Sequence, residues 1–220
     1  MDAPVVAVRG EVTREVPPEL ARFGVTAVAR GKDRSGTLAR LAERGDTVRT
    51  LIDGYGPAIE RRESGALLVR PEWRRSGERV IAYHASVTTT VTVVDFTVLG
   101  ELMMRLAGQD QVQVSGPWWS LRPTSPELGQ ARRAAIAEAI TRARDYADAL
   151  GAEVTGLVEL ADHGMSAPQP VMLRGAPRAF AATEMADPAP QLDLDPQVQT
   201  VQAVVEARFT ISAPAVLRPS

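Results

Sequence analysis

The stretch SPELGQARRAAIAEAITRARDYADALG, residues 125–151, predicts the longest helix of the chain. Ser125 is a good N-cap, and Pro126 suits the first helical position, where its missing N–H costs nothing. Gly151 can end the helix in the left-handed conformation. At 100° per residue one side is apolar and rich in alanine, so we expect that side to lie closely on a sheet. Its members are Leu128, Ala131, Ala135, Ile136, Ala139, Ile140, Ala143, Tyr146, Ala147 and Leu150.

Arg132 is the exception on this helix, because it projects near the centre of the apolar side. One interpretation makes it an anchor for an anion or a carboxylate. The other is an arginine near the first turn whose guanidinium reaches past the edge of the core into water. We favour the second interpretation and keep the first as a possible contact to a ligand or a partner.

The composition limits the number of domains and the classes of function. A chain of 220 residues suits one medium domain or two small lobes, at roughly 100–200 residues per domain. The net charge is −2 with both signs interspersed, which gives no attraction to nucleic acid. The chain has no cysteine, which excludes disulfides, thiolate metal ligands and cysteine nucleophiles.

The N-terminus, MDAPVVAVRG, lacks the basic and apolar regions of a signal peptide. No run of about 18 apolar residues occurs, so we expect no membrane span. These two features favour a cytoplasmic location, or an exported protein whose leader was removed.

The segments around the long helix alternate between apolar and polar residues, which is typical of half-buried strands. We expect strands over 5–16, 22–30, 58–63, 66–71, 79–94, 111–122, 153–160 and 199–212, and further helices between 33 and 53 and between 95 and 108. Strands and helices do not alternate strictly, and no dinucleotide-binding fingerprint follows a strand. The order therefore favours an α+β fold, with antiparallel sheets and three main helices packed on them.

Residues 162–197 form a long segment rich in proline, well beyond the length of an ordinary loop. We expect it to be a loop or an arm that docks on something. We treat 1–215 as one domain, which could divide into a lobe of 4–92 plus 198–213 and a lobe of 93–197.

Four groups of residues occur in an order that resembles the SIMPL domain family. The first is Arg9-Gly10-Glu11-Val12 before Pro17-Pro18, and the second is the strand from Tyr83-His84-Ala85-Ser86 to Val94-Asp95-Phe96, followed by Leu99-Gly100-Glu101. The third is Gly116-Pro117-Trp118-Trp119-Ser120-Leu121. The last is the helix end 147–151 followed by Gly156-Leu157-Val158.

The resemblance covers most of the chain and implies an α+β fold, a tendency to self-assemble and a loose association with stress responses. It implies no catalytic residues. One departure is Asp195-Pro196-Gln197, because family members commonly have Pro-Gly before the final strand. Most bacterial members of the family are exported, whereas this chain shows no leader.

A search for chemistry along the sequence finds little. His84 and His163 are the only histidines, and nothing pairs them locally, so we expect no metal site and no cofactor. No Gly-x-Ser-x-Gly elbow and no phosphate-binding loop occurs.

Two surface features remain as contacts to a partner or a ligand. Arg74 and Arg75 lie in a charge-balanced turn that could meet a phosphate or an acidic partner, although a solvated tip is the commoner case. Trp118 and Trp119 fall on opposite sides of one strand, so we expect one in the core and the other exposed or at an interface.

The hypothesis we prefer is a non-enzymatic module that assembles with itself or binds a protein partner. Our alternative is a binding protein for a small apolar or anionic ligand, held between the sheet and residues 162–197 with Arg132 or Trp119 lining the site. An unrecognised hydrolase is a third hypothesis, but no grouping of serine, histidine and carboxylate supports it.

Overall fold

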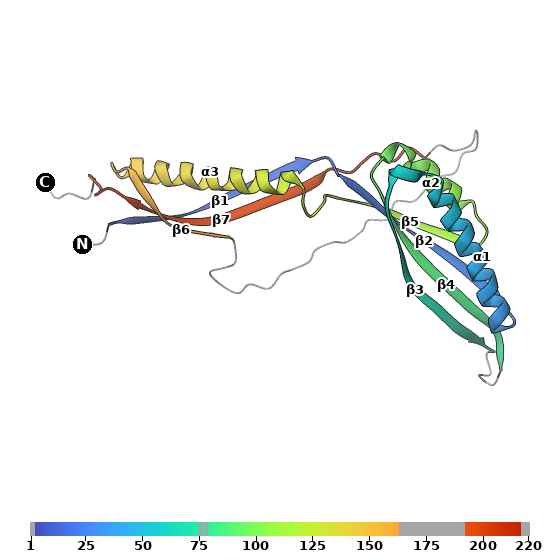
Figure 1. Cartoon of the computed structure of the whole chain (residues 1–220). Helices are drawn as coiled ribbons and strands as arrows, with labels where there is room; N and C mark the ends of the chain where they lie inside the picture. The colour runs from blue at the N-terminus through green and yellow to red at the C-terminus, as the bar shows by residue number, and fades with distance from the viewer. Residues whose placement is uncertain (1–2, 75–76, 78, 163–191, 217–220) are drawn as a thin grey trace, which may run out of the picture. The chain divides into compact units, whose positions relative to one another are not determined.

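The computed structural model describes residues 3–74, 77, 79–162 and 192–216, and these residues form two units, each with its own sheet (Figure 1). The first unit comprises 1–16, 123–184 and 200–220, and the second comprises 17–122 and 185–199. Both sheets are antiparallel and three helices pack on them, which confirms the α+β class. No helix within the described ranges is long and apolar enough to cross a membrane.

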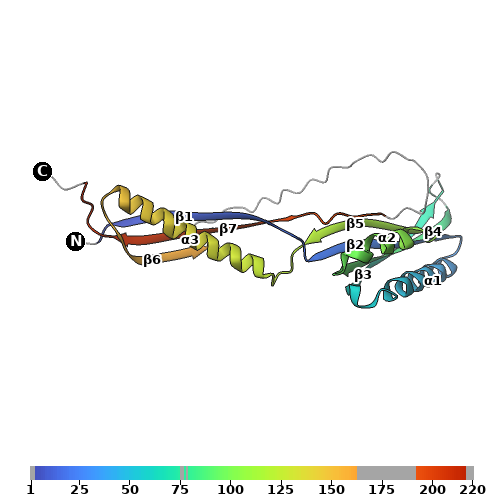
Figure 2. The same cartoon turned by 90° about the horizontal axis from the view of Figure 1, so that it is seen from above.

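The first unit is a three-stranded sheet with one helix on one face (Figure 2). It contains β1 (Val5–Val16), α3 (Pro126–Ala149), β6 (Val154–Asp162) and β7 (Gln199–Ile211), and the strand order is β1-β7-β6. The division expected from the sequence was wrong in two places. Residues 93–122 were grouped with α3 and β6 but belong to the second unit. The strands β1 and β7 were grouped with the strands up to residue 92. They belong with α3 and β6, because they pair with each other and bury their apolar faces beneath α3.

The long helix forms as expected. Ser125 accepts a hydrogen bond from the backbone N–H of Glu127 at 3.3 Å, and Gly151 follows the helix with φ of 60°. Five alanines spaced four apart are completely buried against the sheet: Ala131, Ala135, Ala139, Ala143 and Ala147. Tyr146, expected on the buried side, is instead 52% exposed.

Gly10 in β1 makes the close contact with this helix possible. A Cβ atom at Gly10 would lie 2.0 Å from the backbone oxygen of Ala135 and 2.9 Å from the Cβ of Ala139. The alanine side of α3 therefore packs on a strand position that has no side chain. The small residues on both elements bring helix and sheet closer than larger side chains allow.

The second unit is a four-stranded sheet with two helices on one face (Figure 1). It contains β2 (Leu20–Gly31), α1 (Arg34–Asp53), β3 (Ile59–Trp73), β4 (Val80–Val93), α2 (Leu99–Ala107) and β5 (Val112–Ser120). The strand order is β3-β4-β2-β5. The two separate strands expected over 58–63 and 66–71 are one strand, β3, because a change of register between Ser64 and Leu67 interrupts the pairing without ending it.

The core of the second unit lies between β2, β4 and the two helices. Its largest fully buried side chains include Phe23, Ile52, Leu99, Leu102 and Leu106. The alternation expected for β4 is confirmed: Val91 and Val93 lie opposite Phe23 and Ala21 on the helix side, whereas His84, Thr88 and Thr90 fall on the other face.

Residues 192–198 run without regular structure over α2. Leu194 is half-buried against the core of the second unit. A Cβ atom at Gly100 would lie 1.9 Å from the backbone oxygen of Leu192, so this glycine lets the segment cross the start of α2. Within the predicted segment 162–197 this end is therefore docked, and residues 163–191 lie outside the described residues.

Candidate functional site

The structure separates the residues that the sequence singled out. Arg132 is exposed on α3 and lines a surface pocket of about 480 Å³ with Arg9 and Asp162. This position agrees with the solvated interpretation of Arg132. Arg74 is exposed at the β3–β4 turn, where its N–H donates to the backbone oxygen of Arg79 at 2.9 Å, and Arg75 lies outside the described residues.

The two neighbouring tryptophans of β5 take opposite roles, as expected. Trp119 faces the helices, and its ring meets the ring of Phe96 edge to face, with 4.9 Å between the centroids. Trp118 is 56% exposed on the open face, where its ring passes over Gly24 of β2. Arg132 belongs to the first unit and Trp119 to the core of the second.

A charged cluster on the open face of the second sheet was not predicted as a group. Glu72 of β3 accepts hydrogen bonds from Arg30 at 2.9 Å and from the His84 ring at 2.8 Å. These contacts, with that from Arg30 the larger, hold the pKa of Glu72 below its usual value. Across the described part of the chain, no three histidine, aspartate or glutamate side chains converge as a metal site would require.

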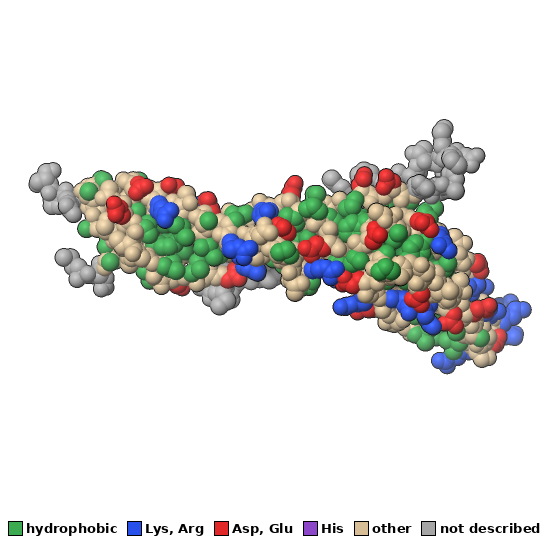
Figure 3. Space-filling view, turned by 45° about the horizontal axis from the view of Figure 1, so that its top comes forward, with side chains coloured by type: hydrophobic (Ala, Val, Ile, Leu, Met, Phe, Trp, Pro, Cys, Tyr) green, Lys and Arg blue, Asp and Glu red, His purple; other side chains and the backbone are tan. Residues whose placement is uncertain are grey.

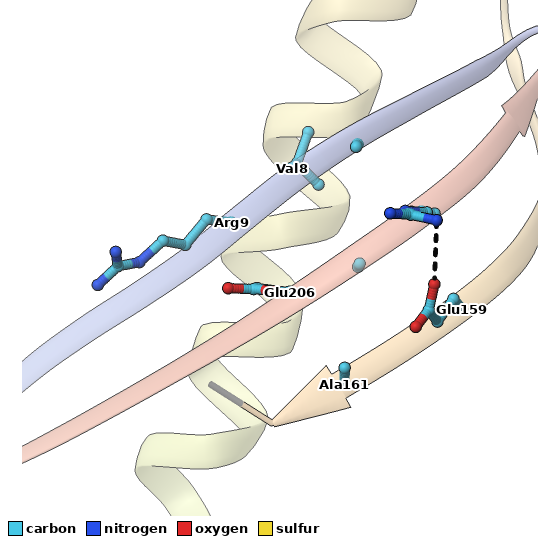
Figure 4. A pocket seen from close by; sticks show the side chains of 8 residues that line it. Val8, Arg9, Glu159, Ala161 and Glu206 are labelled. Atoms are coloured by element: carbon cyan, nitrogen blue, oxygen red, sulfur yellow. Dashed lines mark ion pairs between the residues drawn. The ribbon is translucent and has the colours of Figure 1, made fainter. Parts of the chain in front are cut away.

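The open face of the first sheet carries charges of both signs. A pocket of about 310 Å³ is lined by Ala7 and Ala161 and by two arginines and two glutamates (Figure 4). These are Arg9, Arg208, Glu159 and Glu206. Arg208 pairs with Glu159 of the neighbouring strand at 3.5 Å, and Arg9 pairs with Glu11 at 3.2 Å. The face is polar and balanced in charge, so it favours neither an anion nor a cation.

The outer strand β6 is the most unusual surface of this unit. Leu157, Val158 and Leu160 are 59%, 56% and 46% exposed, although they stand within four residues of one another. Leu157 and Leu160 lie opposite Phe209 and Ala207, which are buried. Leu157 and Leu160 therefore lie on the face of the sheet that carries α3, but they remain largely exposed.

A change of register between Leu157 and Glu159 leaves Val158 unpaired in β6. Since β6 ends the strand order, its outer edge has no neighbouring strand among the described residues. Space-filling Figure 3 shows hydrophobic side chains gathered on the part of the molecule that contains this unit. An exposed apolar edge strand of this kind is a ready template for pairing with another chain.

Sequence reasoning placed a strand here but did not single out its surface. The signal was available, because Leu157, Val158 and Leu160 put apolar side chains on both faces of one short strand. A strand with one face in water would alternate instead. The edge position of β6 turns this pattern into a candidate interface, and the sequence does not show that position.

The family model SIMPL, described as a protein of unknown function (DUF541), matches residues 6–209, so the chain belongs to that family. No curated protein shows significant sequence similarity to it.

Among solved structures, the chain is similar to a Burkholderia cenocepacia protein provisionally described as an amidohydrolase/peptidase. The identity is 18% and the TM-score is 0.29, over 68% of this chain and 36% of the other. The chain thus spans about a third of the length of that protein, and a likeness this low carries no argument about activity.

Proposed function

We propose that this member of the SIMPL family is a non-enzymatic module that assembles with itself, and that β6 forms the contact with a second copy. The observation that carries the proposal is the apolar edge strand, with Leu157, Val158 and Leu160 each about half exposed. The association with stress responses and the absence of catalysis stay predictions from the family resemblance.

Two copies can meet at this edge about a two-fold axis. The same strand then lies antiparallel to itself, and each residue that contacts a partner residue is contacted by its counterpart. Backbone N–H and C=O groups on the outer edge of β6 are satisfied by those of the second copy. The two three-stranded sheets then become one sheet of six strands.

The strength of such a contact can be bounded. Burying the exposed half of six large apolar side chains, three from each copy, contributes roughly 4.5–9 kcal/mol at about 1.5–3 kcal/mol per full side chain. Association itself costs about 4–15 kcal/mol, so the strand hydrogen bonds decide whether a dimer forms. We therefore expect assembly at tens of micromolar protein rather than at nanomolar concentration.

Light scattering after gel filtration tests the proposal with two lysine substitutions. Val158→Lys places a charge on the edge strand and should return the protein to the monomer mass of 23.6 kDa. Leu68→Lys is the matched control, because Leu68 is 53% exposed on β3 of the other unit. The wild type and the control should both have at least twice the monomer mass.

Two results would overturn the proposal. One is a wild type that stays monomeric at high micromolar concentration, which would leave β6 to a different protein partner. The other is a V158K variant whose mass equals that of the wild type. Circular dichroism of both variants should match that of the wild type, because both positions are exposed and the substitutions leave the fold intact.

The alternative expected from the sequence, a ligand held under residues 162–197, involves a segment that is mostly outside the described residues. Of the two residues expected to line that site, Trp119 is in contact with Phe96 and Arg132 is exposed on the other unit.

A further inference from the structure

The second unit has an apolar groove between α1 and the outer strand β3. The groove encloses about 360 Å³, within the roughly 300–1,000 Å³ of small-molecule sites. It exists because α1 packs over β2 and β4, while β3 is exposed along most of its length. Leu41 and Val48 from α1 and Val87 from β4 line it, with Leu67 of β3 at 59% exposure.

One end of the groove is bridged. Arg62 reaches from β3 to the last turns of α1, where it pairs with Asp53 and donates to the backbone oxygen of Arg49 at 3.5 Å. A continuous helix or strand from a partner cannot pass along a groove that is bridged in this way. The shape therefore suits a short molecule that enters with its polar end toward Arg62.

Gly45 is the second observation that points to a ligand. It stands in the middle of α1 and lines the groove. A Cβ atom at this position would meet nothing within 4 Å, so no neighbouring element requires glycine here. Glycine is a poor helix former, yet here it widens the groove beside the apolar side chains of α1.

The charges around the groove indicate the class of ligand. Two guanidiniums, those of Arg49 and Arg62, line it together with the carboxylate of Asp46. The carboxylate of Asp53, which pairs with Arg62, lies outside the lining. Arg49 pairs with Asp46 at 3.0 Å, but both side chains are more than half exposed, and such surface pairs exchange readily. Both contacts of Arg62, with Asp53 and with the Arg49 backbone, are made through Nη1, and a guanidinium has five N–H donors in a fork that matches a carboxylate. The hydroxyls of Ser64 and Thr89 lie in the same lining.

We propose that this groove binds a small amphipathic carboxylate, with its apolar chain between Leu41, Val87 and Leu67 and its carboxylate at Arg49 and Arg62. The site lies wholly within the second unit. It therefore does not depend on self-assembly through β6, and either proposal can fail without the other.

Decanoate is the probe, used below its micelle concentration and followed by calorimetry and by amide NMR shifts of the full chain. We expect saturable binding of one molecule per chain, with the largest shifts around Gly45 and Leu67. Decyltrimethylammonium, which has the same chain length and the opposite charge, should bind at least tenfold more weakly. Equal binding of the two probes would overturn the proposed ligand class.

Two pairs of variants test the location. Gly45→Leu fills the groove and should weaken decanoate binding at least tenfold, whereas Gly45→Ala should keep it within about threefold, in line with the difference in side-chain size. Leu67→Asp places a like charge in the groove and should also weaken binding at least tenfold. Its control is Leu68→Asp, because Leu68 lies opposite Ser86 on the other face of the same strand.

The second pair keeps the test decisive if G45L does not fold, since Leu67 and Leu68 are both exposed by more than half. Decanoate binding that is the same in L67D and L68D would overturn the proposed site. A molar mass from light scattering that falls in L67D but not in L68D would also overturn it, because the groove would then be a contact between copies of the chain. A wild type without saturable binding overturns the proposal outright.

Discussion

At the scale of single residues, Gly10 controls how closely α3 lies on the first sheet. Alanine normally stabilises a strand relative to glycine by about 0.5–1 kcal/mol. Here its Cβ would stand 2.0 Å from the oxygen of Ala135 and 2.8 Å from the nitrogen of Ala139, both of which are backbone atoms that cannot turn aside. We therefore expect Gly10→Ala to lower the free energy of unfolding by about 1–3 kcal/mol or more, measured by urea and far-UV circular dichroism.

Gly129→Ala is the control for this prediction, because Gly129 lies in α3, the helix that packs on Gly10. The nearest atom to a Cβ there is the flexible guanidinium of Arg133 at 3.7 Å. The substitution should raise the free energy of unfolding by up to about 1 kcal/mol. A G10A variant as stable as the wild type would show that helix and strand separate without cost.

At the scale of elements, the N-cap of α1 makes a prediction about pH. Asp33 accepts hydrogen bonds from the backbone N–H of Gly36 at 2.7 Å and from the Ser35 hydroxyl at 3.0 Å. These contacts, that of Gly36 being the larger, lower the pKa of Asp33 from its usual 3.8. A lowered pKa means that the carboxylate stabilises the folded state above 3.8, and that this stabilisation is lost as the pH falls through the folded pKa.

Asp33→Asn keeps an oxygen acceptor at the cap but does not titrate. We expect the wild type to have the higher urea midpoint near neutral pH, because the carboxylate also faces the positive end of the helix. The difference between the two proteins should shrink as the pH falls below 3.8. A difference that stays constant over this range would exclude Asp33 as the titrating group.

The buried side of a helix is a feature that the sequence predicts well. The alanines of α3 were found because a helical period marks one side of a helix. Tyr146 was misplaced because the buried alanines are spaced four apart, so each step advances about 40° around the helix. A fixed helical wheel has no such rotation, whereas a helix that follows a twisted sheet requires it.

At the scale of the whole molecule, the pairing of distant strands was beyond the sequence. Alternation shows that β1 is half-buried, but it does not name the partner strand. The backbone N–H of Ile211 donates to the oxygen of Pro4 at 2.9 Å, which joins the two ends of the chain in one sheet. The same limit hid the candidate site, because the strand β6 was predicted but its place at an edge was not.

The two units also offer separate reporters of unfolding. All three tryptophans, Trp73, Trp118 and Trp119, belong to the second unit, so their emission follows that unit alone. The core of the second unit contains Leu102, which is completely buried, whereas the first unit has its own cluster around Ala147 and Ile211. We expect Leu102→Ala to lower the stability seen by tryptophan emission by about 2–5 kcal/mol.

Gly10→Ala is the counterpart of that variant, because it changes only the contact between β1 and α3. It should lower the urea midpoint seen by circular dichroism and leave the midpoint of tryptophan emission unchanged. If both signals moved together in both variants, the chain would unfold as one cooperative body, and the two cores could not be treated as independent. If they separate, V158K and G45L can each be assessed for folding by the signal of the unit that carries the substitution.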